Sequence, residues 1–267
     1  KDRIMFDALY IAATGMQAQQ LNVDTVANNL ANVNTTGYKK GRVSFSDLMV
    51  RESNRVAAGA DNDRGLFVDP SRVGAGVGIA SLAKLFDAGD MKKTESPMDI
   101  AIQGDGFLEV TLPDGGSAFS RGGTFKVNRD GLLATQSGYA LKPGLSIPDN
   151  AQAVVIANDG RVQARVAGQT NLVDVGQLQL VRFNNPQGLL AQGDALYRSS
   201  EASGEPISGR PGEDGMGTLA QGFLEGSNVK MVEEMINLMV AQRAYEASVK
   251  VIQASDEMLA MTNGLRK

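Results

Sequence analysis

Two aspartates near the start of predicted strands, Asp99 and Asp105, are the side chains of this sequence that could do acid–base chemistry. A pair of carboxylates flanking a glycosidic bond is the arrangement that glycosidases use. Asp105, however, lies between Gly104 and Gly106, where a turn alone explains an aspartate. The sequence also has no tryptophan and only 5 tyrosines to form a sugar-binding platform. An enzyme that uses these two carboxylates is therefore an alternative that the rest of the sequence does not favour.

The residue types that most enzymes and zinc sites require are absent from this sequence. It has no histidine and no cysteine, which excludes imidazole base catalysis, thiolate chemistry, disulfides and Cys/His zinc sites. The glycine-rich run 74–78 resembles half of a dinucleotide-binding fingerprint, but the third glycine is not at the required spacing. A glycine-rich strand is the better interpretation. We therefore expect no enzymatic activity, no cofactor and no bound metal.

Charge and hydropathy argue against two further kinds of partner. The chain has 26 basic and 30 acidic residues, a net charge of −4, which argues against nucleic acid or an anionic membrane surface as the main partner. No apolar run reaches the roughly eighteen residues of a membrane-spanning helix, so we expect no membrane insertion. No apolar segment followed by a small-residue cleavage site is visible, so we expect no cleaved secretory signal.

Apolar residues recur every seven positions near both ends of the chain, which is the spacing of a coiled-coil seam. The pattern predicts one long helix from about Ile4 to Val33 and a second from Ser227 or Asn228 to about Asn263. A single helix cannot bury such a seam, so each helix needs a partner. The seam residues, to which we assign self-assembly, are Met5, Leu9, Met16, Val23, Val26, Leu30, Met231, Leu238, Tyr245, Ile252 and Leu259.

The chain between these helices alternates short apolar runs with Asp-Gly and Gly-Gly turns, a pattern typical of antiparallel strands. Val43–Val50 could form a short helix or a strand, and residues 187–217 look like loops. The predicted fold class is α+β. Long N- and C-terminal helices form a coiled-coil-like layer, and a central all-β domain is inserted between them.

This pattern divides the chain into three regions. Residues 1–33 plus 227–267 form a terminal helical polymerisation domain, residues 34–79 form a linker with an extended excursion, and residues 80–226 form a β-rich domain. The excursion at 51–70 is rich in Ala, Gly, Asn, Asp and Arg. Structureless loops of this length are usually functional or disordered.

Asparagines cluster at the end of the first predicted helix, where Asn28 and Asn32 share one face and Asn29 lies on the adjoining one. Two interpretations remain open. The asparagines cap a fraying helix end, or their amides form a polar latch that binds neighbouring backbone in an assembly. In the turn that follows, Gly37 can adopt a positive φ. The basic run 39–42 after it is expected to be a solvated turn.

Three parts of the sequence resemble, in the same order, the N-terminal signature, the β domain and the C-terminal signature of bacterial flagellar rod and hook proteins. These parts are Ala27–Asn32 with Thr36–Lys39, Ser96–Phe107 with Phe119–Phe125, and Leu224–Val229 with Met239–Glu246. The residues of the terminal signatures that we single out are Asn28, Asn29, Leu30, Asn32, Gly37, Ser227, Asn228, Gln242, Arg243 and Tyr245.

The resemblance implies a structural subunit of the flagellar basal-body rod, which self-assembles into a tubular drive shaft and transmits torque from motor to hook. It implies a helical tubular homo-oligomer that also binds neighbouring rod proteins, the hook protein and the surrounding basal-body rings. It further implies a place in the basal body across the periplasm, reached through the flagellar type III export apparatus without a cleaved signal peptide. The excursion at 51–70 would then add contacts between neighbouring subunits.

Within the family, the run 74–79 and the excursion before it resemble the distal rod pattern. A proximal rod protein or a hook-like axial protein is an alternative. A secreted binding module that docks cell-wall or ring components is another.

Overall fold

The computed structural model describes residues 2–51, 72–168 and 171–264, and it contains a helix at each end of the chain with a β-rich region between them. The predicted α+β class is confirmed at this level. The chain divides into two compact units. The first comprises residues 1–28, 41–83 and 232–267, and the second comprises residues 29–40 and 84–231. The predicted excursion at 51–70 lies, apart from Arg51, outside the described residues.

The elements, in chain order, are α1 (Asp2–Ala31), β1 (Gly41–Arg51), β2 (Arg72–Lys84), β3 (Met91–Lys93), β4 (Asp99–Gln103), β5 (Phe107–Thr111), β6 (Ser117–Ser120), β7 (Gly122–Val127), β8 (Leu133–Thr135), β9 (Ala140–Leu141), β10 (Ala151–Ile156), β11 (Arg161–Val166), β12 (Val173–Gln177), β13 (Leu180–Arg182), the 3-10 turn η1 (Pro186–Gly188), β14 (Leu190–Gly193), β15 (Leu196–Arg198), β16 (Ile207–Gly209), β17 (Thr218–Gln221), β18 (Phe223–Glu225) and α2 (Met231–Gly264).

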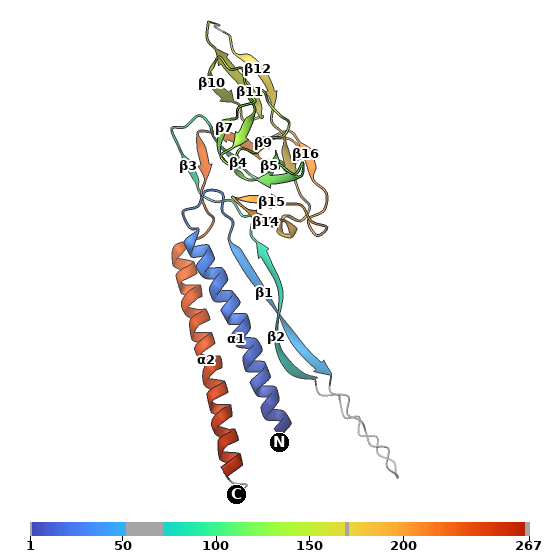
Figure 1. Ribbon diagram of the computed structural model, residues 1–267, viewed down its shortest axis with the longest axis vertical. Coiled ribbons are helices and arrows are strands. Elements are labelled where there is room, and N and C mark those ends of the chain that lie inside the picture. The colour runs from blue at the N-terminus through green and yellow to red at the C-terminus, as the bar shows by residue number, and fades with distance from the viewer. Residues whose placement is uncertain (1, 52–71, 169–170, 265–267) are drawn as a thin grey trace, which may run out of the picture. The chain divides into compact units, whose positions relative to one another are not determined.

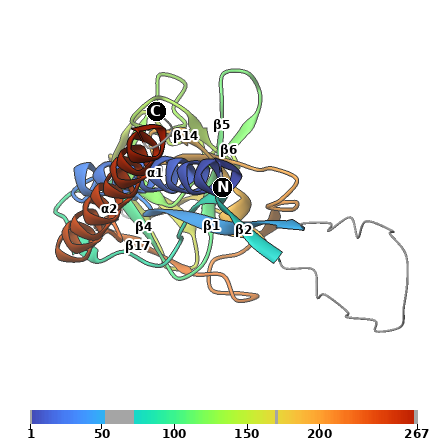
Figure 2. The same ribbon diagram turned by 90° about the horizontal axis from the view of Figure 1, so that it is seen from below.

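In the first unit, the helices α1 and α2 lie side by side and run in opposite directions (Figures 1 and 2). A Cβ atom added to Gly15 would lie 3.7 Å from Ser248 Oγ, so small residues allow the two helices to approach. The buried residues that the structure describes on the two helices are Ala12, Ala18, Val26 and Asn29 on α1, and Glu234, Ala241 and Ser255 on α2. Four of these seven are alanine or serine. The α2 set recurs at multiples of seven residues, so one face of this helix is covered.

The strands β1 and β2 form a two-stranded ribbon in the same unit (Figure 1). Val43–Val50, which could have been helix or strand, therefore belongs to a strand. The glycine-rich run 74–78 lies in β2, as the strand interpretation expected. Val77 N–H donates to Thr14 Oγ1 (3.3 Å), and a Cβ atom on Gly76 would collide with that hydroxyl. Glycine is needed here because the strand backbone lies directly against α1.

The second unit is built on an eleven-stranded antiparallel sheet. The main path of this sheet runs β14-β15-β6-β5-β9-β8-β7-β4-β17, with β13 paired to β5 and β16 paired to β13 beside this path. A three-stranded sheet, β10-β11-β12, and the pair β3-β18 complete the unit. Apolar side chains from the main sheet and from β10 and β11 form one core, represented by Ile100, Leu108, Leu133, Val162 and Leu180.

The prediction that residues 187–217 form only loops is wrong. They contain β14, β15 and β16, each of 3 or 4 residues. Strands this short show no clear alternation of apolar and polar residues, so their pairing with β6 and β13 decides their structure. Among the described residues, no helix has the length and apolar character needed to cross a membrane.

Candidate functional site

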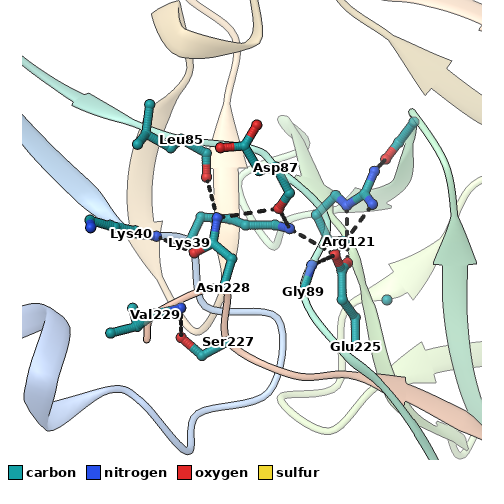
Figure 3. Close-up of polar contacts among 12 residues, drawn as sticks. Lys39, Lys40, Leu85, Asp87, Gly89, Arg121, Glu225, Ser227, Asn228 and Val229 are labelled. Carbon is teal, nitrogen blue, oxygen red and sulfur yellow. Dashed lines mark hydrogen bonds and ion pairs between the residues drawn. The ribbon is translucent and has the colours of Figure 1, made fainter. Parts of the chain in front are cut away.

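Three ionised side chains meet inside the second unit, around the carboxylate of Glu225 (Figure 3). Lys39 Nζ lies 2.7 Å from Glu225 Oε1, and Arg121 Nε lies 3.1 Å from Glu225 Oε2. The exposed fractions of the three residues are 0% for Lys39, 3% for Arg121 and 2% for Glu225. Buried charges persist only when they are paired and hydrogen-bonded, so these three side chains depend on one another in the folded protein.

The three ions come from distant parts of the sequence. Lys39 lies between α1 and β1, Arg121 lies between β6 and β7, and Glu225 is the last residue of β18. The carboxylate of Glu225 also accepts the backbone N–H of Gly89 on Oε1 (2.9 Å). A Cβ atom at Gly89 would collide with the carbonyl oxygen of Gly226, so glycine is required for this approach.

Asn228 provides a second set of cross-links three residues after Glu225 (Figure 3). Its Oδ1 accepts the backbone N–H of Lys40 (2.7 Å), and its Nδ2 donates to the carbonyl oxygens of Leu85 (2.9 Å) and Asp87 (3.2 Å). One amide side chain thus satisfies backbone groups on the segment after α1 and on the segment after β2.

Further bonds join the same segments. Lys39 Nζ donates to the carbonyl oxygen of Asp87 (2.7 Å), and Lys84 Nζ donates to that of Lys39 (3.0 Å). The backbone N–H of Gly37 donates to the carbonyl oxygen of Glu225 (2.8 Å). We call this set the junction, and its members are Gly37, Lys39, Lys40, Lys84, Leu85, Asp87, Gly89, Arg121, Glu225 and Asn228.

Burial and pairing act on the junction's ionisable groups in opposite directions. Burial lowers the pKa of Lys39, and this effect exceeds the opposing attraction of Glu225. Burial also opposes ionisation of Glu225, but Arg121, Lys39 and the Gly89 N–H together hold the pKa of its carboxyl below the ordinary value of 4.5. One buried carboxylate therefore serves two buried cations, and the exposed Asp87 adds only a weaker attraction for Lys39.

Aromatic side chains form a small second core beside the junction. The Arg121 guanidinium lies 5.8 Å from the centre of the Phe107 ring, and its Nη1 donates to the carbonyl oxygen of Gly106 (2.7 Å). Phe86 packs edge-on against Phe107 and Tyr197, with ring centres 5.2 and 4.9 Å apart. Burial raises the pKa of the Tyr197 hydroxyl. The segment after β2 is therefore held by ring packing as well as by hydrogen bonds.

Several residues of the predicted signatures lie in or near the junction. Gly37 has a φ of 69°, as its turn role requires, and is buried. Asn228 is one of the two cross-linking residues. Asn29 is buried and its Oδ1 accepts the Tyr38 hydroxyl (3.2 Å). Ser227 Oγ accepts the Val229 N–H (3.3 Å).

The remaining signature residues lie elsewhere. Asn32 Oδ1 accepts the Thr35 hydroxyl (3.1 Å) just after α1, while Asn28 is exposed on α1. Gln242 and Arg243 are exposed on α2.

The site residues that sequence reasoning missed are the ions themselves. The expectation that the run 39–42 is a solvated turn is wrong for Lys39, which is fully buried. Arg121 and Glu225 both lie inside the family-like runs, but their residue types gave no reason to assign them a role. The signal that could have found them is that the runs 36–39, 119–125 and 224–229 each contain a single charged residue, which lies within two positions of a glycine.

The predicted seam residues differ in exposure within the single chain. Val26 is buried, and Leu9, Met16, Val23, Leu30, Leu238 and Ile252 are half-buried. Met231 is 49% exposed and Tyr245 is 40% exposed. The side chains of Met5 and Leu259 lie outside what the structure describes.

Large apolar side chains gather on the first turns of α2. They are Met231, Val232, Met235, Ile236, Met239 and Val240, which we call the helix patch, and each is about half exposed or more.

The two aspartates that could have formed a catalytic pair lie where their backbone groups stabilise the fold. Asp105 is exposed, and its carbonyl oxygen accepts the Gly217 N–H (2.7 Å) in a turn. Asp99 is buried in β4, where its carbonyl oxygen accepts the Gly222 N–H (2.8 Å). Within the part of the chain that the structure describes, no group of three acidic side chains could hold a metal ion.

Three family models match this chain. The model described as "Flagella basal body rod protein" matches residues 9–39, that of the "Flagellar hook protein FlgE/F/G D1 domain" matches 101–164, and that of the "Flagellar basal body rod FlgEFG protein C-terminal" matches 220–265. A protein of Borreliella burgdorferi named "Flagellar basal-body rod protein FlgG" is 43% identical over 98% of this chain and 100% of its own length. This chain belongs to the flagellar basal-body rod protein family. The predicted family is confirmed.

Two relatives from one organism show which member of the rod protein family this chain is more similar to. The FlgG protein of Caulobacter vibrioides is 42% identical over 97% of this chain and 99% of its own length. The FlgF protein of the same bacterium is 33% identical over 95% of each chain. The higher identity is to FlgG, the distal rod protein. This rod protein is thus a structural component of the flagellar basal-body rod.

The three ions of the junction lie in three different matched ranges. Lys39 lies at the end of the first range, Arg121 lies within the second, and Glu225 lies within the third. Each of the three matched ranges contributes one ion to the cluster.

Proposed function

We propose that this rod protein is the subunit of the distal rod, and that it self-assembles through its terminal helices into a tubular shaft that transmits torque from the motor to the hook. The near-full-length similarity to FlgG proteins supports the distal assignment over the proximal one. Residues 1–33 plus 227–267 act as the polymerisation domain in this proposal, and residues 80–226 act as the β-rich domain.

The observation that carries the proposal is the helix patch. Its six residues form two adjacent rows along α2, Met231–Met235–Met239 and Val232–Ile236–Val240, each spaced by four residues. Burying one such side chain contributes about 1.5–3 kcal/mol. A coiled-coil-like layer in which neighbouring subunits cover this patch and the seam would therefore offset the cost of ordering the helices.

The same proposal includes the binding partners of the subunit and the route by which it is exported. Copies of this chain form the tube, neighbouring rod proteins and the hook protein bind its ends, and the basal-body rings surround it across the periplasm. Export through the flagellar type III apparatus without a cleaved signal peptide would deliver the subunits. The excursion at 51–70, together with Asn28 and Asn32 at the end of α1, would add contacts between neighbouring subunits.

Electron microscopy of the full-length protein and of a charged variant tests this function. Val232→Asp with Ile236→Asp places two carboxylates in the helix patch, and the matched control, Lys250→Glu, changes the charge of an exposed residue on the same helix. We expect straight tubes from the wild-type and control proteins and none from the double variant. Tubes of unchanged yield from the double variant would contradict assembly through α2 and favour a binding module.

A further inference from the structure

We propose that the junction is a mechanical clasp, which makes the chain segments that lead into and out of the terminal helices hold or release together. The proposal rests on the proposed function, because a subunit that transmits torque must pass force between its helical segments and its β sheet. It assigns this task to named residues.

Two side chains, those of Glu225 and Asn228, hold several chain segments together. Glu225 binds Lys39 in the segment after α1, Gly89 in the segment after β2, and Arg121 between β6 and β7. Asn228 binds the segment after α1 and the segment after β2 again. Since Glu225 and Asn228 themselves lie in the segment before α2, all three connecting segments are tied by parallel bonds. Several bonds therefore oppose a force that separates these segments.

The clasp is also anchored in the main sheet. Arg121 joins Glu225 on one side and the carbonyl oxygen of Gly106, just before β5, on the other. Gly106 and Phe107 adjoin a core of fully buried residues that includes Leu108 and Leu180. Force on the segment before α2 therefore reaches the sheet through a buried guanidinium as well as along the covalent chain.

Electrostatics makes the loss of Glu225 costly for the whole junction. If Lys39 leaves, Glu225 keeps Arg121 as a partner, but if Glu225 leaves, two buried cations lose their common counterion. Removing one member of a buried ion pair is strongly destabilising because an uncompensated charge remains. Opening at Glu225 is therefore the step that the junction resists most, because it removes the counterion of both cations at once.

Single-molecule force measurement on the full-length protein tests the clasp. The chain has no cysteine, so Lys250→Cys on α2 and Asp130→Cys in the turn after β7 provide unique attachment points in every variant. Force applied between these points passes through residues 225–230. The test variant is Glu225→Gln. The control is Glu109→Gln, the same substitution in a partly exposed ion pair with Lys142.

We expect Glu225→Gln to shorten the lifetime of the first opening event at constant force roughly tenfold or more, since tenfold corresponds to only about 1.4 kcal/mol. Glu109→Gln should change it less than about twofold. Equal lifetimes in the wild-type and Glu225→Gln proteins would overturn the proposal. An equal shortening by both substitutions would do the same, because it would indicate general weakening of the sheet.

A second variant covers the case in which Glu225→Gln does not fold. Asn228→Ala leaves the three ions in place and removes the other cross-link, so it should also shorten the first event. An unchanged lifetime in Asn228→Ala would then overturn the proposal. Failure of the wild-type protein to form tubes would count against the proposed function alone, because the clasp is measured on single molecules.

Discussion

Replacing Glu225 by glutamine isolates the charge of the junction with little change in shape. The new amide can still accept the Gly89 N–H on its oxygen, but its NH2 group would face the Arg121 Nε–H that Glu225 Oε2 now accepts at 3.1 Å. Lys39 and Arg121, which are 0% and 3% exposed, would lose their counterion. Losing one partner of a buried pair costs about 3–5 kcal/mol. At about 2–4 °C per kcal/mol, the melting temperature of the second unit should fall by roughly 6–20 °C.

Lys39→Met and the double variant complete the measurement. Lys39→Met leaves the Arg121–Glu225 pair intact and should cost less, about 1–3 kcal/mol, mainly through lost hydrogen bonds. In the double variant one buried cation is left instead of two, so its cost should be smaller than the sum of the single costs. Calorimetry and near-ultraviolet circular dichroism of the full-length proteins would give these values. A loss below about 1 kcal/mol for Glu225→Gln, which is the range of an exposed pair, would refute the reasoning.

Three further predictions concern acid, the ribbon and one strained turn. The pKa of Glu225 is lowered below 4.5, so the contribution of its carboxylate to stability is complete above that value and is lost as pH falls through the lowered pKa. The difference in melting temperature between wild type and Glu225→Gln should therefore narrow below about pH 4.5. A difference that stays constant with pH would contradict this prediction. Gly76→Ala should destabilise the ribbon by about 1–3 kcal/mol and speed hydrogen exchange at the Val77 amide, because Gly76 has a φ of 108° and lies against Thr14. Gly74→Ala, where an added Cβ meets nothing within 4 Å, is the control. Ala195→Gly should stabilise the second unit by about 1 kcal/mol in urea denaturation, because Ala195 has a φ of 55° that an L side chain resists; an unchanged midpoint would be the contrary result.

The sequence alone predicted the two long helices and the β-rich region between them because their signals are local. The apolar repeat predicted two long helices, and the helices found, Asp2–Ala31 and Met231–Gly264, begin and end within a few residues of the expected positions. Asp-Gly and Gly-Gly turns predicted that the second unit is rich in β structure, since turn chemistry depends on a few adjacent residues. The family likeness of three runs of sequence pointed to the rod proteins, and residues inside those runs now lie together in the junction.

The tertiary structure decided which residues face one another. A repeat of seven marks several columns on a helix, and in the single chain the buried column of α2 contains Glu234, Ala241 and Ser255, while Met231 and Tyr245 remain exposed. Small residues allow α1 to approach closely. Which column of α2 is buried therefore depends on the neighbouring helix rather than on the repeat itself. The burial of Lys39 was also decided by the tertiary structure. A lysine between a turn and a strand looks solvated until the chain brings Glu225, 186 residues away, to its ammonium group. Local sequence fixes backbone geometry, whereas burial and ion pairing are set by partners that only the folded chain brings together.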